Sequence, residues 1–534
     1  MSMNKFLIFA GLLLASCGAN QTVKTAQIAT SNPINLQDGY LYSSSMYGYE
    51  STGPAANIAV LLPLSGDAKS VGNDIKTSIE TAFLRKNAHN IKVSFFDLPN
   101  DKTNHNDVLR EALNTNPDVI IGPLFAEDAE NLRDMKSSSI PVISFTSSAN
   151  ALGDNLTTIN LIPTQSIETI VQQMQKDGAK NMIVLAPNDN SGQSMASVAD
   201  RVSSAYNLPI RGLFYYTPGN TESIKDVAIR ASMYNARKAA NTRAREVLSD
   251  ILTKENLPYQ TRYNLRKQLE KISRTETLGE LPYDAILFLG SGEDSKTLAS
   301  FLRYYGIGNR DAAFYGTTLW HNSDIASDLT LSGAKYATLP EITDNFKSLY
   351  NMMAGKDPDY LSAFGYDAAN ITLGMLYSQK NQFAYLYDPS GYMGTTGIFR
   401  LQPSGESERA LRIMELNGSG TVNILSDAPT NFLVPLYNIR TTNLRPVAER
   451  ELSSRGINPG DYIDIPDDLR RKSAYKTKTI GANYTDSKDS EETNNAPIQI
   501  FESHDNEVIS NPEFESVKQE SVSRQYIDTI EIEE

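Results

Sequence analysis

Cysteine and histidine are scarce in this chain of 534 residues, which limits the kinds of site that it can contain. Cys17 is the only cysteine, so residues 18–534 can form neither a disulfide bond nor a thiolate metal site. The four histidines lie far apart and show no spacing typical of metal ligands: His89, His105, His321 and His504. We therefore predict neither a metal nor another cofactor, and an enzyme that uses a histidine base is not expected.

Long apolar runs are also missing, since no stretch approaches the length of a membrane-spanning helix. The N-terminus has only a short apolar stretch, from Phe6 to Leu14, which follows Lys5 and precedes the small residues Ala15 and Ser16. A positive start, a short apolar core and small residues at its end are typical of a secretory signal peptide. We predict this peptide over residues 1–17.

The end of the predicted signal peptide, Leu14–Cys17, resembles the lipobox read by the lipoprotein signal peptidase. This motif predicts lipidation of Cys17, and two or more acyl chains anchor a protein stably in a membrane. Gly18 follows the cysteine in place of an aspartate, which favours the outer membrane with the protein facing the periplasm. An ordinary signal peptide with an incidental cysteine is the alternative.

Negative charge is in excess, and most of the excess lies at the C-terminal end. The formal net charge is −14, and residues 481–534 contain 14 Asp and Glu against 3 Lys and Arg. The rest of the chain is nearly neutral and cannot form a dominant basic face, so nucleic acid is not expected as a partner. Residues 18–55 and 441–534 are polar, which predicts a flexible linker and a disordered acidic tail. The tail is either a solvating segment, which its composition favours, or an acidic docking motif.

Short apolar runs alternate with helical patterns from Asn57 onward. Ile58–Leu62 is wholly apolar, ends at Pro63 and precedes a stretch with apolar residues on one helical face. The same unit recurs along the chain, for example at 118–121 and 181–185. Apolar strands joined by helices are typical of a parallel sheet that is covered on both faces, so we expect an α/β fold with right-handed crossovers.

The strand and helix units form two successive series, which predicts two lobes of similar design. We expect lobe one in residues 56–162 and 346–390, and lobe two in residues 163–345. Residues 222–280 differ in having 12 Lys and Arg against 8 Asp and Glu and two apolar stripes at helical spacing. They predict a helical hairpin inserted into lobe two, which either binds a partner or packs only on its own lobe.

Residues 391–440 are expected to close the fold and to return the chain to lobe two. Gly394–Leu401 and Ala410–Leu416 are apolar segments on either side of a turn at Pro403–Gly405. This pattern predicts a β-hairpin.

Five of these segments, in their order along the chain, resemble the type I periplasmic binding-protein fold in its branched-chain amino-acid-binding branch. They are Ile58–Gly66, Asp118–Leu124, Ile140–Ser148, Gly365–Ala369 and Gly394–Gly397, and the resemblance covers about residues 56–420. A narrower set resembles the penicillin-binding-protein activator lipoproteins of Gram-negative bacteria. This set comprises the lobe-two insertion, Leu281–Ala285, Tyr315–His321, and Gly397–Gly405 with Arg409 and Arg412.

The narrower resemblance implies a lipid-anchored, non-enzymatic periplasmic protein that docks on a class A penicillin-binding protein and stimulates peptidoglycan synthesis. The alternative is the solute-binding receptor of an ABC-type transporter, whose lobes close on a small polar ligand. In such a fold the ligand lies between the lobes, at the carboxyl ends of the strands.

Polar residues at the predicted strand ends form a candidate inter-lobe cleft: Ser65, Thr146, Ser147, Ser148, Asn188, Asp189, Ser191, Thr317, Thr318 and Trp320. The three hydroxyls after the strand at 140–144 suit a carboxylate, whereas Glu127 and Asp128 would repel one. No acid stands at Thr317 or Thr318, where the resembled receptors tend to bind an ammonium group. We therefore expect another small polar ligand, or none. The single tryptophan of the set faces the cleft or, alternatively, packs inside its lobe.

Catalytic motifs are absent or incomplete. Ser332 and Lys335 have the Ser-x-x-Lys spacing of penicillin-interacting enzymes, but the companion Ser-Asp-Asn and Lys-Thr-Gly motifs do not occur. The sequence also lacks a Walker A motif, a GxSxG elbow and a dinucleotide fingerprint. An enzyme is not predicted.

Overall fold

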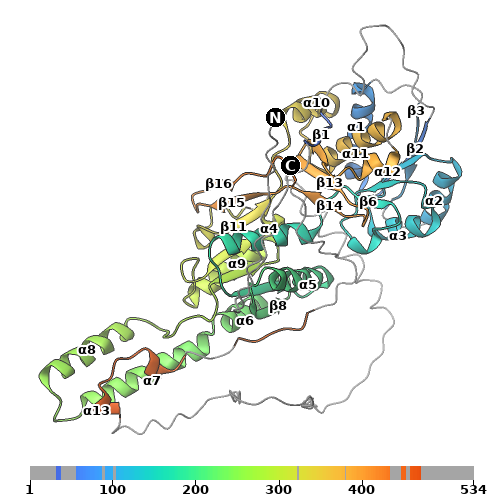
Figure 1. Ribbon diagram of the computed structural model, residues 1–534. Coiled ribbons are helices and arrows are strands. Elements are labelled where there is room, and N and C mark those ends of the chain that lie inside the picture. The colour runs from blue at the N-terminus through green and yellow to red at the C-terminus, as the bar shows by residue number, and fades with distance from the viewer. Residues whose placement is uncertain are drawn as a thin grey trace, which may run out of the picture.

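Two α/β lobes and a projecting helical arm make up the computed structural model of this protein (Figure 1). The structure describes residues 32–37, 56–86, 91–99, 104–321, 324–378, 381–432, 447–452 and 457–470. The predicted fold class, two lobes with parallel sheets flanked by helices and a helical insertion in lobe two, is confirmed.

Lobe one is a parallel five-stranded sheet with helices on both faces. Its elements are β2 (Ala56–Leu62), α1 (Lys69–Arg85), β3 (Ile91–Asp97), α2 (His105–Asn114), β4 (Val119–Ile121), α3 (Ala126–Met135), β5 (Val142–Ser144), η1 (Ala149–Ala151), β6 (Leu156–Thr158), α10 (Asp344–Ala354), α11 (Tyr360–Tyr377) and α12 (Gln382–Leu386). The strand order is β3-β2-β4-β5-β6. Successive side chains of a strand point to opposite faces. Ile58 and Val60 therefore pack with α1 and α11, whereas Ala59 and Leu61 pack with α2 and α3.

Lobe two has a larger sheet in the order β16-β15-β11-β10-β9-β7-β8. Its elements are α4 (Pro163–Lys176), β7 (Met182–Pro187), α5 (Asn190–Ala205), β8 (Ile210–Tyr216), α6 (Thr221–Ala231), β9 (Ala285–Phe288), α9 (Gly292–Tyr304), β10 (Ala313–Gly316), η2 (Thr318–Trp320), η3 (Leu329–Leu331), β11 (Lys335–Thr338), β15 (Arg412–Leu416) and β16 (Val422–Ser426). Met182 and Val184 face α4 and α5, whereas Ile183 and Leu185 face α6 and α9. Each sheet is thus buried on both sides.

A third sheet, which we call the C-terminal sheet, lies beside the junction of the lobes. It consists of β1 (Ile34–Asn35), β12 (Tyr392–Gly394), β13 (Gly397–Leu401) and β14 (Ser407–Arg409), paired in that order. β1 runs parallel to β12, and the following Leu36 is buried in the main core. The expected flexible linker over 18–55 is therefore wrong for residues 32–37. A strand of only two residues shows no alternation of apolar and polar residues, so it cannot be predicted from the sequence without its partner strand.

The predicted β-hairpin between Gly394–Leu401 and Ala410–Leu416 is wrong in its pairing. β13 pairs with β12 and β14, whereas β15 leaves this sheet and pairs antiparallel with β11 of lobe two. The reason is that β11 offers an open edge, and β15 buries Ile413 and Leu416 against the lobe-two core there. The chain passes between the lobes in three crossing segments, residues 159–162, 339–343 and 410–411.

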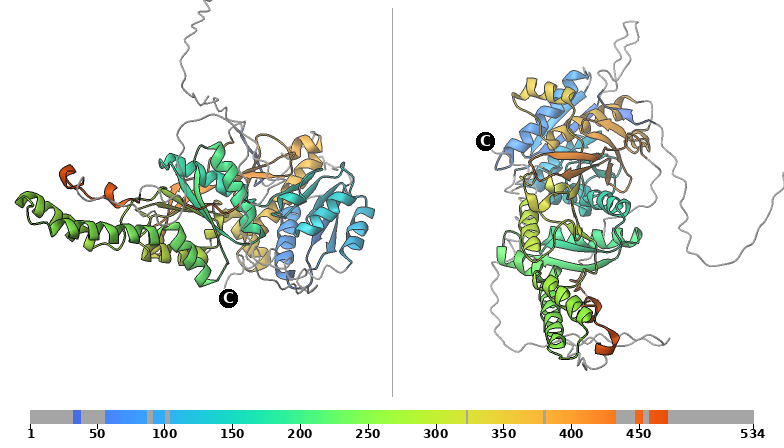
Figure 2. Two further views of the ribbon diagram at one scale, coloured as in Figure 1. Left: turned by 90° about the horizontal axis from the view of Figure 1, so that it is seen from below. Right: turned by 90° about the vertical axis from the view of Figure 1, so that its left-hand side faces the viewer.

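The insertion in lobe two is a two-helix arm, α7 (Tyr234–Leu252) and α8 (Tyr259–Ser273), which projects from the lobe in every view (Figures 1 and 2). The predicted insertion over 222–280 begins too early. α6 buries Ile224 and Val227 in the core under the lobe-two sheet, so it is part of the lobe. A helical pattern alone does not distinguish a covering helix from an inserted one.

A C-terminal strap, which we define as residues 447–452 and 457–469, covers the arm and the lobe-two edge. Arg450 forms an isolated antiparallel bridge with Leu213 on β8. Further along, Ile463, Ile465 and Leu469 pack into the apolar seam between α7 and α8. The strap contains η4 (Pro459–Asp461) and the start of α13 (Asp467–Arg470).

The predicted disordered tail over 441–534 is therefore wrong for the strap. Its apolar residues are sparse, but the arm places a complementary seam beside them, so they become buried. Residues 471–534, like residues 1–17 with Cys17, lie outside the described residues. Among the helices of the described ranges, none is both long and apolar enough to cross a membrane.

We predict that Ile463→Ala combined with Ile465→Ala loosens the arm. Each side chain is 3% exposed, and truncating a buried isoleucine to alanine costs about 2–5 kcal/mol. Because the arm projects from lobe two, the loss is expected as local opening, and limited proteolysis measures it as faster cleavage within 234–273.

Ile424→Ala on β16 is the matched control because Ile424 is 52% exposed. Its cleavage rate is expected to equal that of the unchanged protein. An unchanged rate in the double variant would show that the strap does not stabilise the arm.

Candidate functional site

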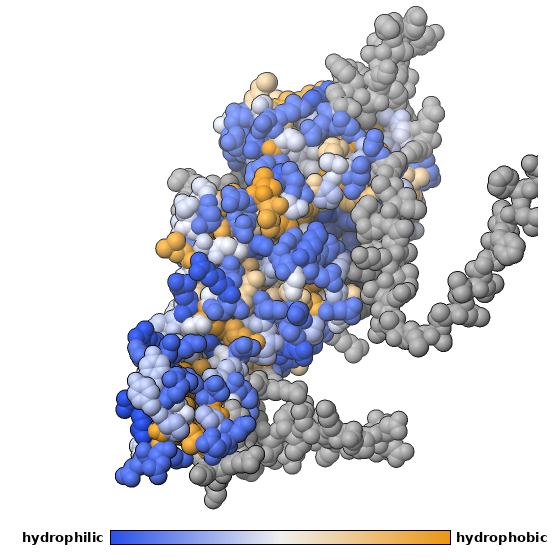
Figure 3. Space-filling view, turned by 60° about the vertical axis from the view of Figure 1, so that its left-hand side comes forward, coloured by the Kyte–Doolittle hydropathy of each residue, from blue (hydrophilic) through white to orange (hydrophobic). Residues whose placement is uncertain are grey.

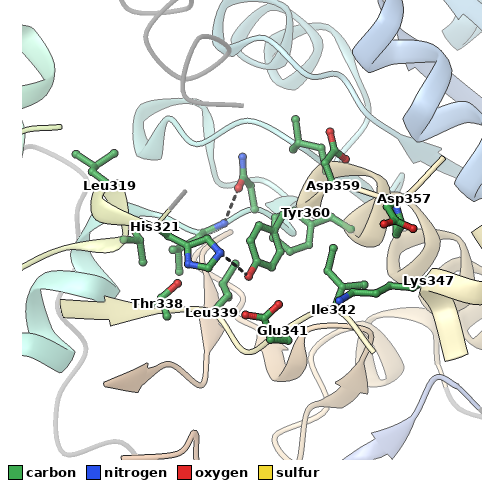
Figure 4. A pocket seen from close by; sticks show the side chains of 16 residues that line it. Leu319, His321, Thr338, Leu339, Glu341, Ile342, Lys347, Asp357, Asp359 and Tyr360 are labelled. Carbon is green, nitrogen blue, oxygen red and sulfur yellow. Dashed lines mark hydrogen bonds between the residues drawn. The ribbon is translucent and has the colours of Figure 1, made fainter. Parts of the chain in front are cut away.

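A cavity of about 310 Å³ lies between the lobes, beside the segment that returns the chain from lobe two to lobe one (Figure 4). This volume is at the lower end of the range for small-molecule sites. The residues that line it come from both lobes and from two crossing segments: Asn160, Leu161, Thr318, Leu319, His321, Thr338, Leu339, Glu341, Ile342, Lys347, Asp357, Pro358, Asp359, Tyr360, Leu361 and Phe364.

His321 of lobe two and Tyr360 of lobe one meet across this cavity (Figure 4). The distance from His321 Nε2 to Tyr360 Oη is 3.2 Å, and the ring centroids are 5.5 Å apart. Burial lowers the pKa of His321, although Glu341 acts to raise it. The imidazole is therefore neutral at physiological pH. The Tyr360 hydroxyl also lies 3.4 Å from the carbonyl of Pro340, so the tautomer of His321 decides which of the two side chains donates to the other.

Carboxylates outnumber cations on the cavity wall, where Glu341, Asp357 and Asp359 face a single lysine, Lys347. Asp359 is already engaged, since its Oδ1 caps α11 by accepting from Ser362 N at 2.7 Å. The lining contains no serine or cysteine that could serve as a nucleophile. The charged and hydroxyl groups of the wall suit binding of a small polar molecule.

A buried acid, Asp367, fixes the turn between β12 and β13. Its side chain is fully buried on α11, and it accepts hydrogen bonds from Thr395 N at 3.0 Å and from Thr395 Oγ1 at 3.0 Å. Burial raises the pKa of Asp367 to about 7, against the opposing effects of the Arg409 charge and of the Thr395 donors. The carboxylate thus ties the C-terminal sheet to lobe one.

Arg409, at the end of β14, is the buried cation opposite this acid. Its Nε donates to the carbonyl of Ile159 at 3.0 Å, and its Nη1 donates to Thr396 Oγ1 at 3.1 Å. The guanidinium carbon lies 4.1 Å from the ring centroid of Phe364 and 4.5 Å from that of Phe399. Burial lowers the pKa of Arg409 to about 9, although Asp367 acts to raise it. Arg409 therefore connects the first crossing segment, the C-terminal sheet and α11.

The predicted cleft residues of lobe one lie at the strand ends, where the Ser65 amide and the Thr146 hydroxyl take part in local structure. The Ser65 backbone amide donates to Asp97 Oδ1 at 3.1 Å. Thr146 is buried, and its Oγ1 accepts from Ser148 N at 3.1 Å. Ser147 and Ser148 are half-buried. None of these four residues lines the cavity described above.

In lobe two, the predicted residues are also engaged in capping and packing. Asp189 Oδ1 accepts from Gly192 N at 2.7 Å and caps α5, which leaves exposed Asn188 and half-buried Ser191 beside it. Thr317 Oγ1 accepts from Leu319 N at 3.4 Å. The structure thus places these four side chains at the start of α5 and of η2.

The last two predicted cleft residues, Thr318 and Trp320, differ in whether they reach the cavity. Thr318 lines the cavity. Trp320 is 1% exposed in the lobe-two core, where its Nε1 donates to Ser295 Oγ at 2.9 Å and its ring lies 5.7 Å from that of Phe288. The prediction that Trp320 belongs to the cleft is wrong because the short η2 turn directs the indole beneath the sheet.

Sequence reasoning missed most of the cavity wall. His321 and Tyr360 are 39 positions apart, and no motif connects them. Asp359 had one usable signal, a helix N-cap pattern of Asp followed by Ser362, but that pattern predicts a helix start and not a cavity.

A family model described as a periplasmic binding protein matches residues 55–378. The chain belongs to this family. A solved structure from Rhodospirillum rubrum, assigned to a branched-chain amino acid ABC transporter, superimposes with a TM-score of 0.51 at 17% identity. That match covers 70% of this chain and 100% of the other, and it shows the shared fold.

Curated relatives add a narrower similarity. Over 141 residues the chain is 33% identical to the penicillin-binding protein activator LpoA of Glaesserella parasuis serovar 5 (strain SH0165). This match covers 26% of this chain and 24% of the relative. Over 207 residues it is 25% identical to LpoA of Pasteurella multocida (strain Pm70), and this match covers 36% of this chain and 35% of that relative. The predicted resemblance to the activator lipoproteins is confirmed, and the matches span about a quarter to a third of these relatives.

We predict that Arg409→Met strongly destabilises the protein. It leaves the buried carbonyl of Ile159 and the hydroxyl of Thr396 without their donor and removes the charge that acts on Asp367, and each buried acceptor left unsatisfied costs about 1–3 kcal/mol. Urea unfolding should show this loss, and adding Asp367→Asn should restore part of it. Arg110→Met is the control, because that side chain is 61% exposed. Equal stability of the Arg409 and Arg110 variants would contradict a structural role for the buried pair.

We also predict a pH dependence of stability from Asp367. Its pKa is raised to about 7 in the folded state, so the folded protein binds this proton more tightly than the unfolded chain does. The associated stability is present at low pH and is lost as the pH rises from near 4 to about 7.

Unfolding titrations across this range should show the free energy of unfolding of the unchanged protein falling relative to that of Asp367→Asn. Asp357→Asn removes an exposed carboxylate and should follow the unchanged protein. Parallel pH profiles for all three proteins would refute the assignment.

Proposed function

We propose that this protein is a non-enzymatic periplasmic regulator that docks on a class A penicillin-binding protein and activates peptidoglycan synthesis. The main support is its similarity to two proteins named as penicillin-binding protein activators. Docking shifts the synthase toward an active state if the regulator binds that state more tightly.

The strand-end loops support docking over transport of an amino acid. A receptor needs free hydroxyls and backbone donors for a carboxylate, and an acid for an ammonium group. In this protein Thr146 and Thr317 accept hydrogen bonds from their own loops, and Asp189 caps α5. A charged ligand placed there without partners would pay a desolvation cost of several kcal/mol.

The Ser332 and Lys335 pair supports a non-enzymatic role. Ser332 Oγ donates to the carbonyl of Asn417 at 3.2 Å, and Lys335 Nζ forms an ion pair with Asp177 at 2.8 Å. A serine nucleophile would need the lysine amine as its own partner. The two side chains instead have separate structural partners.

We further propose that Cys17 is lipidated and anchors the protein in the outer membrane. β1 joins the folded body at Ile34, so only residues 18–33 lie between the anchor and the first docked strand. Sixteen extended residues span at most roughly 55 Å. The anchor therefore places the lobes within reach of the cell wall and close to the membrane.

The decisive experiment combines binding with activity. The protein from Gly18 onward should retain a class A penicillin-binding protein in a pull-down and raise its rate of glycan polymerisation. Another solute-binding protein of the same fold is the control and should do neither. A failure of both binding and stimulation would refute the regulator.

The receptor alternative has its own outcome in a thermal-shift screen. A ligand that binds only the folded state raises the melting temperature, because the added stability grows with the logarithm of the ratio of its concentration to its dissociation constant. A clear rise with one amino acid or small polar solute, together with no effect on the synthase, would favour the receptor.

The anchor is tested separately with Cys17→Ala. The unchanged protein is expected in the outer-membrane fraction and to incorporate labelled fatty acid. Cys17→Ala should lose the label and the membrane association, and Ser16→Ala should keep both because small residues are tolerated before the cysteine. Persistent labelling of Cys17→Ala would disprove lipidation at this position.

A further inference from the structure

The outer face of α8 is an exposed stripe of aromatic and basic side chains, which we call the α8 stripe. It consists of Tyr259, Tyr263, Arg266, Lys267 and Lys271, and each lies three or four residues from another of the set, so that they share one helical face. Tyr259 is 82% exposed and Tyr263 is 52% exposed. The surface of the arm is mostly hydrophilic in the space-filling view (Figure 3).

Within the described ranges, the three cations of this stripe differ from neighbouring arginines of the arm, whose side chains have hydrogen-bond or ion-pair partners. Arg245 and Arg262 donate to backbone carbonyls, and Arg274 is paired with Glu270. By contrast, no ion pair within 4 Å joins the three cations of the α8 stripe to any carboxylate in the described ranges. Their charge is available to an anionic partner.

The strap brings the C-terminal part of the chain to this helix. Gln268 of α8 exchanges two hydrogen bonds with the backbone of Asp464, at 3.0 and 2.9 Å. Leu469 then packs into the seam between α7 and α8. The sequence that follows the strap therefore starts at the seam between α7 and α8, about one helix width from the α8 stripe.

That following sequence has complementary chemistry. Residues 481–534 contain 14 acidic against 3 basic residues, and Phe514 is flanked directly by Glu513 and Glu515. Carboxylates match the exposed cations, and a phenyl ring matches exposed tyrosines and arginine.

We propose that the acidic tail, residues 481–534, docks on the α8 stripe of its own chain. The spacer 471–480 extends to at most roughly 35 Å, whereas the 15 residues of α8 are only about 22 Å long. The tail can therefore reach the whole stripe. Tethering gives it a millimolar effective concentration, so even weak contacts suffice. The docked tail shields the arm from other anionic partners and makes access to it dependent on salt.

The proposal is independent of the function proposed above, and distance measurements between two spin labels test it. The chain from Gly18 to Glu534 has no cysteine, so Asn256→Cys at the tip of the arm and Ser510→Cys in the tail give two unique labelling sites. We expect a short, narrow distance distribution at about 50 mM salt and a longer, broader one at about 1 M, where screening reaches only a few ångströms.

Charge reversal at the stripe provides the specific test. Arg266→Glu, Lys267→Glu and Lys271→Glu together should give the high-salt distribution at low salt. Lys69→Glu, Lys92→Glu and Arg310→Glu change three exposed cations outside the arm by the same total charge and should leave the short distances intact. If the reversal variant does not fold, Lys267→Gln with Lys271→Gln should still lengthen the distances.

Two outcomes would overturn the proposal. Short distances that persist after reversal of the stripe would place the tail elsewhere on the protein. If the short distances are lost equally in the stripe variant and the control variant, the tail is attracted to the net charge of the protein and has no specific docking site.

Discussion

The junction of the two lobes depends on two buried ionisable groups that attract each other, Asp367 and Arg409, each of which has hydrogen-bond partners of its own. Asp367 holds the β12–β13 turn through Thr395, and Arg409 binds the carbonyl of Ile159 in the first crossing segment. Burying two charges is costly, and the cost is offset only where each has partners of its own. The pair therefore specifies one arrangement of α11, the C-terminal sheet and the crossing segments. Phe364 stacks on Arg409 and also lines the cavity, so the junction and the cavity share a wall.

Segments from both ends of the chain complete the fold around this junction. β1 adds an edge strand to β12, and the strap bridges β8 through Arg450 before it covers the arm. The strap gives the arm a third element, so that Leu248 and Leu265 are buried although α7 and α8 project away from the lobes. This construction holds the two-helix arm out from a firmly packed body.

Much of the fold could be predicted because apolar strands and helix patterns are local. Ile58–Leu62 and Asn181–Leu185 both appear as strands of parallel sheets, as expected. The candidate site was less accessible to prediction. Thr318 lines the cavity, but Trp320 and Thr146 are engaged within their own lobes, since a polar residue after a strand serves a turn or a cap as readily as a ligand.

The amino-acid sequence by itself determined the two-lobed α/β class, because burial of a sheet on both faces requires continuous apolar strands. It also determined the charge asymmetry and, because Cys17 is the only cysteine, the absence of a disulfide bond within the chain. Tertiary structure alone decided where β15 pairs, which side of the strap becomes buried and how His321 meets Tyr360. These contacts join residues far apart in the chain, and their energy exists only when the partner surface is already in place.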